Sequence, residues 1–433
     1  MAYNPGLFKL FDEGIVNCRD HYIRMKQHPS GEQVSQIHVQ IDNGKITMYN
    51  NGNGIDIEKH PEHNIWIPEM IFGHLRTSTN YNKTEKKITG GKNGFGFKLV
   101  LIWSTYGKIE TIDHVRGLKY VQEFEQNLDI IHKPKITKSK SKPYTSVTFI
   151  PDYSRLGIEN LSQEMISLFQ RRVYDIGGIT PKTVKVKFNN ESIKVNDFKH
   201  YVQLYLNEEQ KKQTLYEEPN VRWSYVVSLS HEYKQVSFVN GIHTSKGGKH
   251  VDYIVNQITK KMIAYILQKK KVNVKPAIIK EQIMIFVNCV IENPSFDSQT
   301  KDYMNTPHAK FGSSCVVSDG FIEKIAKMGV MEVACNLTEA KENKLAKKTD
   351  GSKTRTIRGI NNFIDANFSG TTQSKDCILI LCEGLSALSG IVSGLSSDDR
   401  NIIGIYPMKG KILNVRGEPN KKIICLLYTS DAA

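Results

Sequence analysis

Glu13 and Asn17 lie four residues apart in a segment with the pattern of a helix, so their side chains share one helix face. A carboxylate in that position can deprotonate a water molecule, and an amide oxygen beside it can bind Mg²⁺. Most acid–amide pairs at this spacing belong to a solvated surface. The chemical interpretation therefore depends on which other segments the fold brings to this face.

Two glycine-rich segments follow in the sequence. In Asn51-Gly52-Asn53-Gly54 the glycines allow the backbone to approach a ligand closely, and Asn51 offers a donor and an acceptor to a flat heterocycle. The alternative for this segment is a plain turn. The second segment opens a helix, so its backbone N–H groups can bind an anion while Lys92 and Lys98 add positive charge. Its candidate ligand-binding residues are Gly91, Lys92, Asn93, Gly94, Phe95, Gly96, Phe97 and Lys98.

Three small polar residues precede the second glycine segment, namely Ser78, Thr79 and Asn80. Their hydroxyl and amide groups can bond the oxygens of a ribose or a phosphate. Taken alone they fit an ordinary loop. Together with the acid-bearing helix and the two glycine segments, in this order, they indicate a nucleotide site.

The hydrophobic pattern predicts the elements that position these residues. Asn4-Pro5 predicts a helix start, with the proline at the first helical position. The buried stripe of this helix is predicted to be Leu7, Leu10, Phe11 and Cys18. Strands are predicted over 37–42 and 45–51, joined by a two-residue hairpin turn at Asn43-Gly44. Helices follow over 68–75, 97–103 and 163–174, and strand-like runs reach residue 150 with an interruption at the lysine-rich stretch 133–142.

From about residue 183 the pattern changes to a mixed α/β unit. Its predicted strands are 183–188, 224–229, 235–239 and 283–291, with a long helix over 251–270. Residues 339–372 are polar, basic and glycine-containing, which is typical of a linker. A short apolar strand over 377–381 opens a third unit.

The composition limits the class of protein. The 433 residues allow two or three domains, and the formal net charge of +15 favours a polyanionic partner, with nucleic acid before an acidic membrane. The alternative is an ordinary basic protein. Seven scattered cysteines without metal-site spacing favour a reducing, intracellular compartment. The longest apolar run, 283–291, is too short to span a bilayer, and we expect no membrane partner and no signal peptide.

Residues 11–17 (FDEGIVN), 49–55 (YNNGNGI) and 89–99 (TGGKNGFGFKL) resemble the three ATP-site boxes of the GHKL ATPases. That family includes type II topoisomerases, Hsp90-type chaperones, MutL-type repair proteins and histidine kinases, and the boxes alone do not choose among them. The resemblance implies ATP and Mg²⁺ as cofactors. It also implies Glu13 as the catalytic base and Asn17 as the magnesium ligand.

Residues 238–251 and 291–301 (IENPSFDSQTK) resemble the transducer of type II topoisomerases. In that family a Gln-Thr-Lys loop reaches from the transducer into the ATP site. This implies that Gln299 and Lys301 contact the γ-phosphate, with Thr300 in the same binding loop. Lys301 would be catalytic, because phosphoryl transfer needs positive charge where negative charge builds up.

Residues 377–387 (CILILCEGLSA) resemble the start of a TOPRIM domain, whose glutamate binds the metal used in DNA cleavage. That role maps to Glu383. Residues 406–415 (YPMKGKILNV) resemble the following family segment, where a lysine and an asparagine lie against DNA. The matching DNA-binding residues are Lys411 and Asn414, and Lys269, Lys270 and Lys271 match a lysine loop that touches passing DNA. The alternative for the three lysines is a solvated helix end.

The resemblance covers about residues 3–416 and favours the eukaryotic type over bacterial gyrase, because Asn51 stands where gyrase-like relatives carry Asp. Three departures are present. The sequence begins at the first ATP box, without the family's preceding strap, and it ends before the D-x-D metal ligands and the tyrosine that attacks DNA. Leu385 replaces the acidic residue of the usual E-G-D-S-A. We therefore expect a fragment that does not cleave DNA by the family mechanism.

The expected fold class is α/β. We expect a GHKL ATPase sandwich over 1–190, a transducer of ribosomal S5-like fold over 191–335, a basic linker over 336–374 and the start of a TOPRIM domain over 375–425. The expected function is ATP-dependent double-strand passage by a DNA topoisomerase. The intact enzyme would act as a homodimer on double-stranded DNA, in the nucleus or another DNA-containing compartment. Two alternatives stay open: an inactive topoisomerase-like DNA-binding fragment, and another GHKL ATPase of Hsp90 or MutL type.

Overall fold

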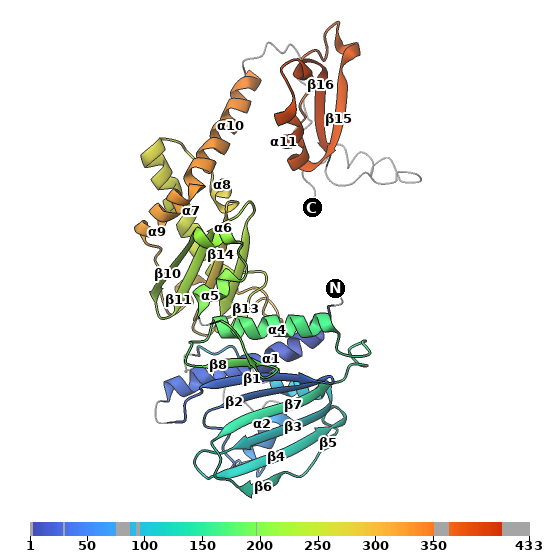
Figure 1. Ribbon diagram of the computed structural model, residues 1–433, viewed down its shortest axis with the longest axis vertical. Coiled ribbons are helices and arrows are strands. Elements are labelled where there is room, and N and C mark those ends of the chain that lie inside the picture. Colours follow the sequence, from blue (N-terminus) through green and yellow to red (C-terminus); the bar gives the residue numbers. More distant parts are fainter. Residues whose placement is uncertain are drawn as a thin grey trace. The chain divides into compact units, whose positions relative to one another are not determined.

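The computed structural model describes residues 3–28, 31–74, 87–91, 96–195, 197–349 and 363–408, with 341–349 described as backbone (Figure 1). The chain divides into two compact units, Met1–Ala340 and Lys341–Ala433. Nine residues predicted to bind ATP or DNA lie outside the described residues: Ser78, Thr79, Asn80, Lys92, Asn93, Gly94, Phe95, Lys411 and Asn414.

A large mixed sheet occupies the first part of the first unit. Within the described ranges its strand order is β5-β4-β3-β7-β2-β1-β8-β9, and β6 pairs with β4. The pairing of β1 with β8 is parallel, whereas β2 pairs antiparallel with both β1 and β7. The strands are β1 (Gln36–Asp42), β2 (Lys45–Asn51), β3 (Ser104–Ile112), β4 (Leu118–Glu125), β5 (Ile130–Ile131), β6 (Lys135–Lys138), β7 (Tyr144–Pro151), β8 (Lys185–Phe188) and β9 (Glu191–Ser192).

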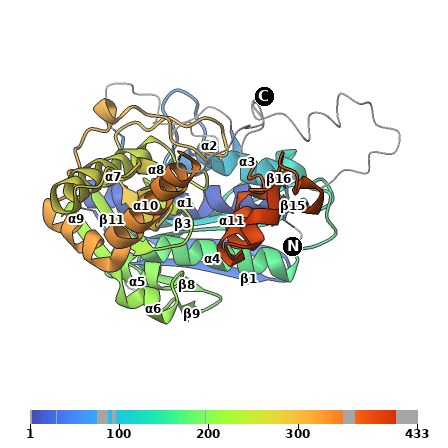
Figure 2. The ribbon, with the colours of Figure 1, turned by 90° about the horizontal axis from the view of Figure 1, so that it is seen from above.

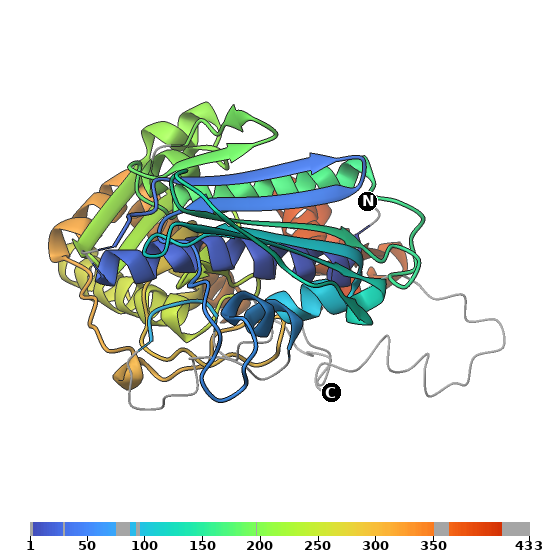
Figure 3. The ribbon, with the colours of Figure 1, turned by 90° about the horizontal axis from the view of Figure 1, so that it is seen from below.

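Helix α1 (Pro5–Gln27) lies against this sheet, as the view from below shows (Figure 3). It begins as predicted, because the Asn4 side chain accepts a hydrogen bond from the Leu7 N–H at 3.0 Å. Phe11 stacks on Phe169 of α4 (Gln163–Gly178) with ring centroids 4.1 Å apart. The predicted stripe of Leu7, Leu10, Phe11 and Cys18 is buried. Two short helices, α2 (Ile67–Gly73) and α3 (Gly96–Ile102), complete this part.

The β1–β2 hairpin confirms the predicted turn. Asn43 and Gly44 have φ angles of 47° and 76°, the left-handed backbone that a two-residue hairpin of this kind requires. The prediction that the lysine-rich stretch 133–142 interrupts the strands was wrong in one respect. Strand β6 lies inside this stretch and pairs with β4. Its mostly exposed lysines and threonine suit a strand at the sheet edge, where charge blocks pairing with other chains.

A second sheet follows in the same unit, with strand order β10-β11-β14-β12-β13 among the described residues. Its strands are β10 (Thr214–Asn220), β11 (Trp223–Leu229), β12 (Lys234–Val239), β13 (Ile242–His243) and β14 (Ile283–Cys289). Helix α7 (Lys249–Lys270) lies over these strands (Figure 2), and its Ile254 and Ile258 share a core with Ile285 of β14. The strands predicted near β11, β12 and β14 and the long helix are confirmed. The other helices are α5 (Phe198–Gln203), α6 (Glu208–Lys212), α8 (Pro276–Lys280), α9 (Asp319–Ile325) and α10 (Met331–Thr349).

Helix α10 enters the region predicted to be a linker, so residues 336–349 are helical. Glutamate, alanine, lysine and leucine dominate this stretch, and all four favour helix. The predicted boundary between the ATPase and transducer domains near residue 190 stays a prediction. The last strand of the first sheet, β9, ends at Ser192.

The second unit contains a parallel pair, β15 (Ile378–Glu383) and β16 (Ile403–Met408), with α11 (Gly384–Gly394) and α12 (Asp399–Ile402). The predicted strand at 377–381 is thereby confirmed. Across the described residues, no helix combines the length and apolar character needed to cross a membrane.

Candidate active site

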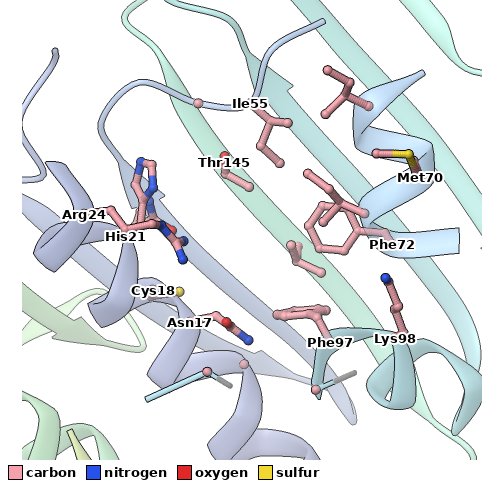
Figure 4. Close-up of a pocket in the computed structure, with 18 of the residues that line it drawn as sticks. Asn17, Cys18, His21, Arg24, Ile55, Met70, Phe72, Phe97, Lys98 and Thr145 are labelled. Atoms are coloured by element: carbon pink, nitrogen blue, oxygen red, sulfur yellow. The ribbon is translucent and has the colours of Figure 1, made fainter. Parts of the chain in front are cut away.

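A cavity of about 810 Å³ opens in the first unit between α1 and α3 (Figure 4). Residues of β2 and of the segment around residues 299–301 also line it. This volume is in the range of sites for small organic ligands. Of the residues predicted from the sequence, its lining includes Glu13, Asn17, Gly91, Gly96, Phe97, Lys98, Gln299 and Lys301. The fold therefore brings residues from both sheet regions to one cavity.

The Glu13 carboxylate has close contacts at both of its oxygens. Glu13 is only 8% exposed, and its Oε1 accepts a hydrogen bond from Lys301 Nζ at 3.0 Å. Lys9 Nζ lies 3.2 Å from the same oxygen. The other oxygen, Oε2, lies against Gly96, where any side chain would collide with it. Glycine at the start of α3 thus leaves room for the Glu13 carboxylate in this position.

Asn17 lies one helical turn after Glu13, on the same face, as predicted. Its Nδ2 donates to the Glu13 backbone carbonyl at 2.7 Å, which fixes the orientation of the amide. With Nδ2 used in this way, the Oδ1 atom is the one suited to a cation. A Cβ on Gly91 would lie 3.6 Å from that oxygen, so the glycine segment passes directly beside it.

Asp20 was missed by the sequence reasoning. Its two carboxylate oxygens accept hydrogen bonds from the N–H groups of Gly90 and Gly91 at 2.9 and 2.8 Å, and the side chain is 1% exposed. Burial raises the pKa of Asp20, although these bonds and Arg24 favour its charged form. Glu13, Asn17 and Asp20 recur at i, i+4 and i+7, and this spacing was the available signal.

Asn51 does not line the cavity. Its Oδ1 accepts from the N–H groups of Ser35 and Gln36, both at 2.8 Å, and its Nδ2 donates to the Ser35 hydroxyl. The preceding residue, Asn50, lines the cavity instead. Side chains alternate along β2, so Asn50 shares the inner face with Met48 and Asn51 points to the other face. The structure therefore places the side chain of Asn50 at the cavity, and not that of Asn51.

The α3 side of the cavity combines an aromatic ring with a buried cation. Phe97 packs edge-on against Phe72 with ring centroids 5.3 Å apart (Figure 4). Lys98 is 2% exposed, and burial lowers its pKa. Across the cavity, His21 was not predicted. Burial, with nearby Arg24, lowers the pKa of His21 to about 4, so its imidazole is neutral at pH 7.

The predicted Gln299-Thr300-Lys301 loop is only partly in the cavity. Gln299 and Lys301 line it, whereas the Thr300 hydroxyl bonds Ser298 and Asp302 at 2.8 Å each. Lys301 has a φ of 63°, a left-handed conformation that is costly for a non-glycine residue. Such strain is tolerated where the surrounding structure holds a side chain at a functional position.

The second sheet region also supports the glycine segment. The Asn240 side chain donates to the Ile291 carbonyl at 2.9 Å and to the Thr89 carbonyl at 3.4 Å. The Asn293 N–H donates to the Lys87 carbonyl at 2.9 Å. The stem of the glycine segment and the segment leading to Lys301 are therefore bonded to each other.

Among the described residues, those predicted to contact DNA do not line the cavity. Lys269, Lys270 and Lys271 are exposed at the end of α7, and Lys271 caps it in a left-handed conformation. Glu383, which was predicted to bind a metal, is exposed at the end of β15 in the second unit, two residues before the exposed Leu385.

Two groups of side chains have metal-ligand character. His60, Glu62 and His63 have ligand atoms within 4.8 Å of one another and line the cavity. Asp56, Asp113 and His114 form a similar group. In the second group Arg116 pairs with both Asp56 and Asp113, so its carboxylates already have a cationic partner.

Comparison with known proteins identifies the family. Residues 186–353 match the model of a family described as DNA gyrase B. The DNA topoisomerase 2 of Candida glabrata is 44% identical over 430 residues, which cover 95% of this chain and 30% of that protein. The chain thus spans less than a third of the length of this relative.

Two solved structures match the described fold. The ATPase region of Saccharomyces cerevisiae topoisomerase II has a TM-score of 0.71 and 45% identity, covering 77% of this chain and 86% of that one. The ATPase and transducer domains of DNA topoisomerase II from Balamuthia mandrillaris give a TM-score of 0.73 at 38% identity, covering 79% and 87% of the two chains. These matches also decide against an Hsp90-type or MutL-type ATPase. The chain belongs to the eukaryotic-type DNA topoisomerase II family and matches the ATPase region of its members.

Proposed function

We propose that this chain binds and hydrolyses ATP as the ATPase part of a type II DNA topoisomerase, which passes one DNA duplex through another. The meeting of Glu13 and Lys301 carries this proposal. They are 288 positions apart in the sequence, and their charged atoms lie 3.0 Å apart at the edge of a nucleotide-sized cavity. Burying charges costs desolvation energy, so such a pair beside a cavity favours a chemical role.

In the proposed reaction Glu13 is the general base. Oε1 is occupied by two lysines, so Oε2 is the oxygen that orients a water molecule and accepts its proton. Lys301 stabilises the negative charge that develops on the transferred phosphoryl group. Asn50 contacts the heterocycle, and Lys98 adds positive charge on the α3 side.

The donor set fits a magnesium ion bound together with the nucleotide. Mg²⁺ prefers oxygen ligands and commonly takes only one or two from the protein, the remainder coming from phosphates and water. Asn17 Oδ1, oriented by its own amide bond to the helix, would be that protein ligand. The ion, when bound, offsets the negative charge of the phosphates.

Outside the cavity we propose a contact with double-stranded DNA at Lys269, Lys270 and Lys271. Exposed lysines bind phosphates without reading sequence, which suits an enzyme that must act on any duplex. We further propose that the intact enzyme is a homodimer in the nucleus or another DNA-containing compartment, with Glu383 as a metal ligand. A DNA-binding fragment without ATP turnover is the remaining alternative.

Calorimetry with a non-hydrolysable ATP analogue and Mg²⁺ tests the nucleotide site. The chain should bind the analogue, and Asn17→Ala should abolish measurable binding. Gln27→Ala, an amide-to-alanine change at the exposed end of the same helix, is the matched control and should bind normally. Equal affinity of Asn17→Ala and the wild type would contradict the proposed site.

A further inference from the structure

The Glu13–Lys301 ion pair stands at the end of a continuous chain of charges. Arg172 Nε donates to Asp12 Oδ1 at 2.7 Å, and Lys9 bridges Asp12 at 3.0 Å and Glu13 at 3.2 Å. Lys301 then closes the chain on Glu13 Oε1. Glu13 and Lys301 are each 8% exposed, so water screens their interaction little.

The proposed function assigns Lys301 a second partner. If Lys301 stabilises the terminal phosphate of ATP, its ammonium must turn from a carboxylate to a phosphate oxygen or be shared between them. The terminal phosphate also brings negative charge towards Glu13. Since both changes weaken the Glu13–Lys301 pair, binding of a terminal phosphate competes directly with this pair.

Binding of a nucleoside diphosphate does not require the Glu13–Lys301 pair to weaken. Its last phosphate is one position short of the site at which Lys301 acts, so the ion pair can remain intact. The free energy of the pair is therefore subtracted from the binding of ATP and not from the binding of ADP.

We propose that the Glu13–Lys301 pair sets the preference of this site between triphosphate and diphosphate nucleotides. This inference rests on the proposed ATP-binding function. Glu13 holds Lys301 through Oε1 until a terminal phosphate takes the lysine, so this positive charge leaves the Glu13 carboxylate only when the substrate is bound. Lys9 is a positioning residue in this exchange, because it keeps a positive charge on the same Glu13 oxygen when Lys301 leaves.

The test compares the affinities for a non-hydrolysable ATP analogue and for ADP, each with Mg²⁺, by calorimetry. Glu13→Gln frees Lys301, so affinity for the analogue should rise about tenfold, equivalent to about 1.4 kcal/mol, while affinity for ADP changes less than about twofold. In a Lys301→Met background the same Glu13→Gln change should no longer alter the ratio of the two affinities.

Lys9→Met gives a prediction of opposite sign that does not depend on the folding of Glu13→Gln. It leaves Lys301 as the main partner of Glu13, so the pair tightens and affinity for the analogue should fall about fivefold relative to ADP. Lys9→Arg should restore the wild-type ratio. Glu159→Gln removes an exposed carboxylate outside the cavity lining and should leave the ratio unchanged.

The outcomes separate the two proposals. A wild-type chain that binds neither nucleotide would contradict the proposed function itself. Normal binding of both, with a ratio that Glu13→Gln and Lys9→Met do not move, would overturn the role of the ion pair alone. An equal rise for ATP analogue and ADP in Glu13→Gln would also overturn it, because it would show general repulsion of phosphates by Glu13.

Discussion

The charges of the cavity and the charges at the end of α7 are arranged in opposite ways. Glu13 and Lys301 are buried and bonded to each other, and their positions come from segments far apart in the sequence. Lys269, Lys270 and Lys271 are neighbours in sequence and exposed to solvent. A buried pair acts through fixed geometry, whereas an exposed cluster acts through its summed charge. Substitutions in the two regions should therefore differ in size and in their dependence on salt.

The largest expected effect follows from Glu13→Ala. ATP binding should persist, because Asn17, Asn50 and Lys98 remain, but turnover should fall by about 10²–10⁴, the usual contribution of a positioned general base. Turnover is measured in a preparation whose wild type hydrolyses ATP. The control is Glu62→Ala. Glu62 is another acid of the cavity lining, and in the described part of the structure it pairs with no lysine. A wild-type rate for Glu13→Ala would make Glu13 a structural acid.

The next effect concerns the buried end of the charge chain. Arg172 is 1% exposed and pairs with Asp12, so Arg172→Met leaves a buried carboxylate without its main partner. The free energy of unfolding should fall by about 3–5 kcal/mol, measured by urea denaturation. Arg171→Met removes the neighbouring exposed arginine, which bonds Tyr205, and should cost less than about 1 kcal/mol. An equal loss of unfolding free energy in the two variants would show that burial of the arginine does not determine its contribution to stability.

The contribution of the Asp12–Arg172 ion pair to stability should depend on pH. Burial opposes the ionisation of Asp12, but Arg172 and Lys9 outweigh it and hold the pKa of Asp12 well below its usual range. A carboxyl group whose pKa is depressed by folding stabilises the protein above its unfolded pKa of about 3.9, and this stability is lost as the pH falls below that value. Asp12→Asn should therefore flatten the decline in stability between about pH 4 and pH 2. A decline as steep as that of the wild type would contradict the ion pair.

The smallest effect is expected at the exposed lysines. Replacing Lys269, Lys270 and Lys271 by alanine should weaken duplex binding mainly at low salt and reduce the slope of log affinity against log salt by up to about 2.7, or roughly 0.9 per lost phosphate contact. ATP binding should not change. Alanine at Lys211 and Lys212, two lysines of α6, is a control for general loss of charge. An unchanged salt slope would remove these lysines from the DNA contact.

Local patterns in the sequence predicted much of this site, and the errors have physical causes. The start of α1, the β1–β2 turn and the shared face of Glu13 and Asn17 depend on neighbouring residues, so they could be read directly. Asn50 and Asn51 are adjacent amides in a strand, and only the pairing of β2 shows which one faces the cavity. Asp20 was not singled out, because its partners, the N–H groups of Gly90 and Gly91, come from a segment 70 residues further along the chain.

The position of Lys301 could not be predicted from local sequence patterns. Its position beside Glu13 depends on the folding of both sheet regions, and no periodicity in the sequence links the two residues. The resemblance to a known loop implied only that Lys301 reaches the ATP site, and the structure adds its contact with Glu13 Oε1 at 3.0 Å.

The separation of 288 residues between Glu13 and Lys301 has a consequence for biosynthesis. Ribosomes add about 5–20 residues each second, and the first sheet can begin to fold before the later segment exists. Contacts between residues so distant in the sequence form late, because a long loop must close before they contribute. A nascent chain should therefore pass through a period in which Glu13 and Asn17 are in place but Lys301 is not. Under the proposed function such a chain should hydrolyse ATP more slowly than the finished one, because Lys301 is the last of the described lining residues to be synthesised.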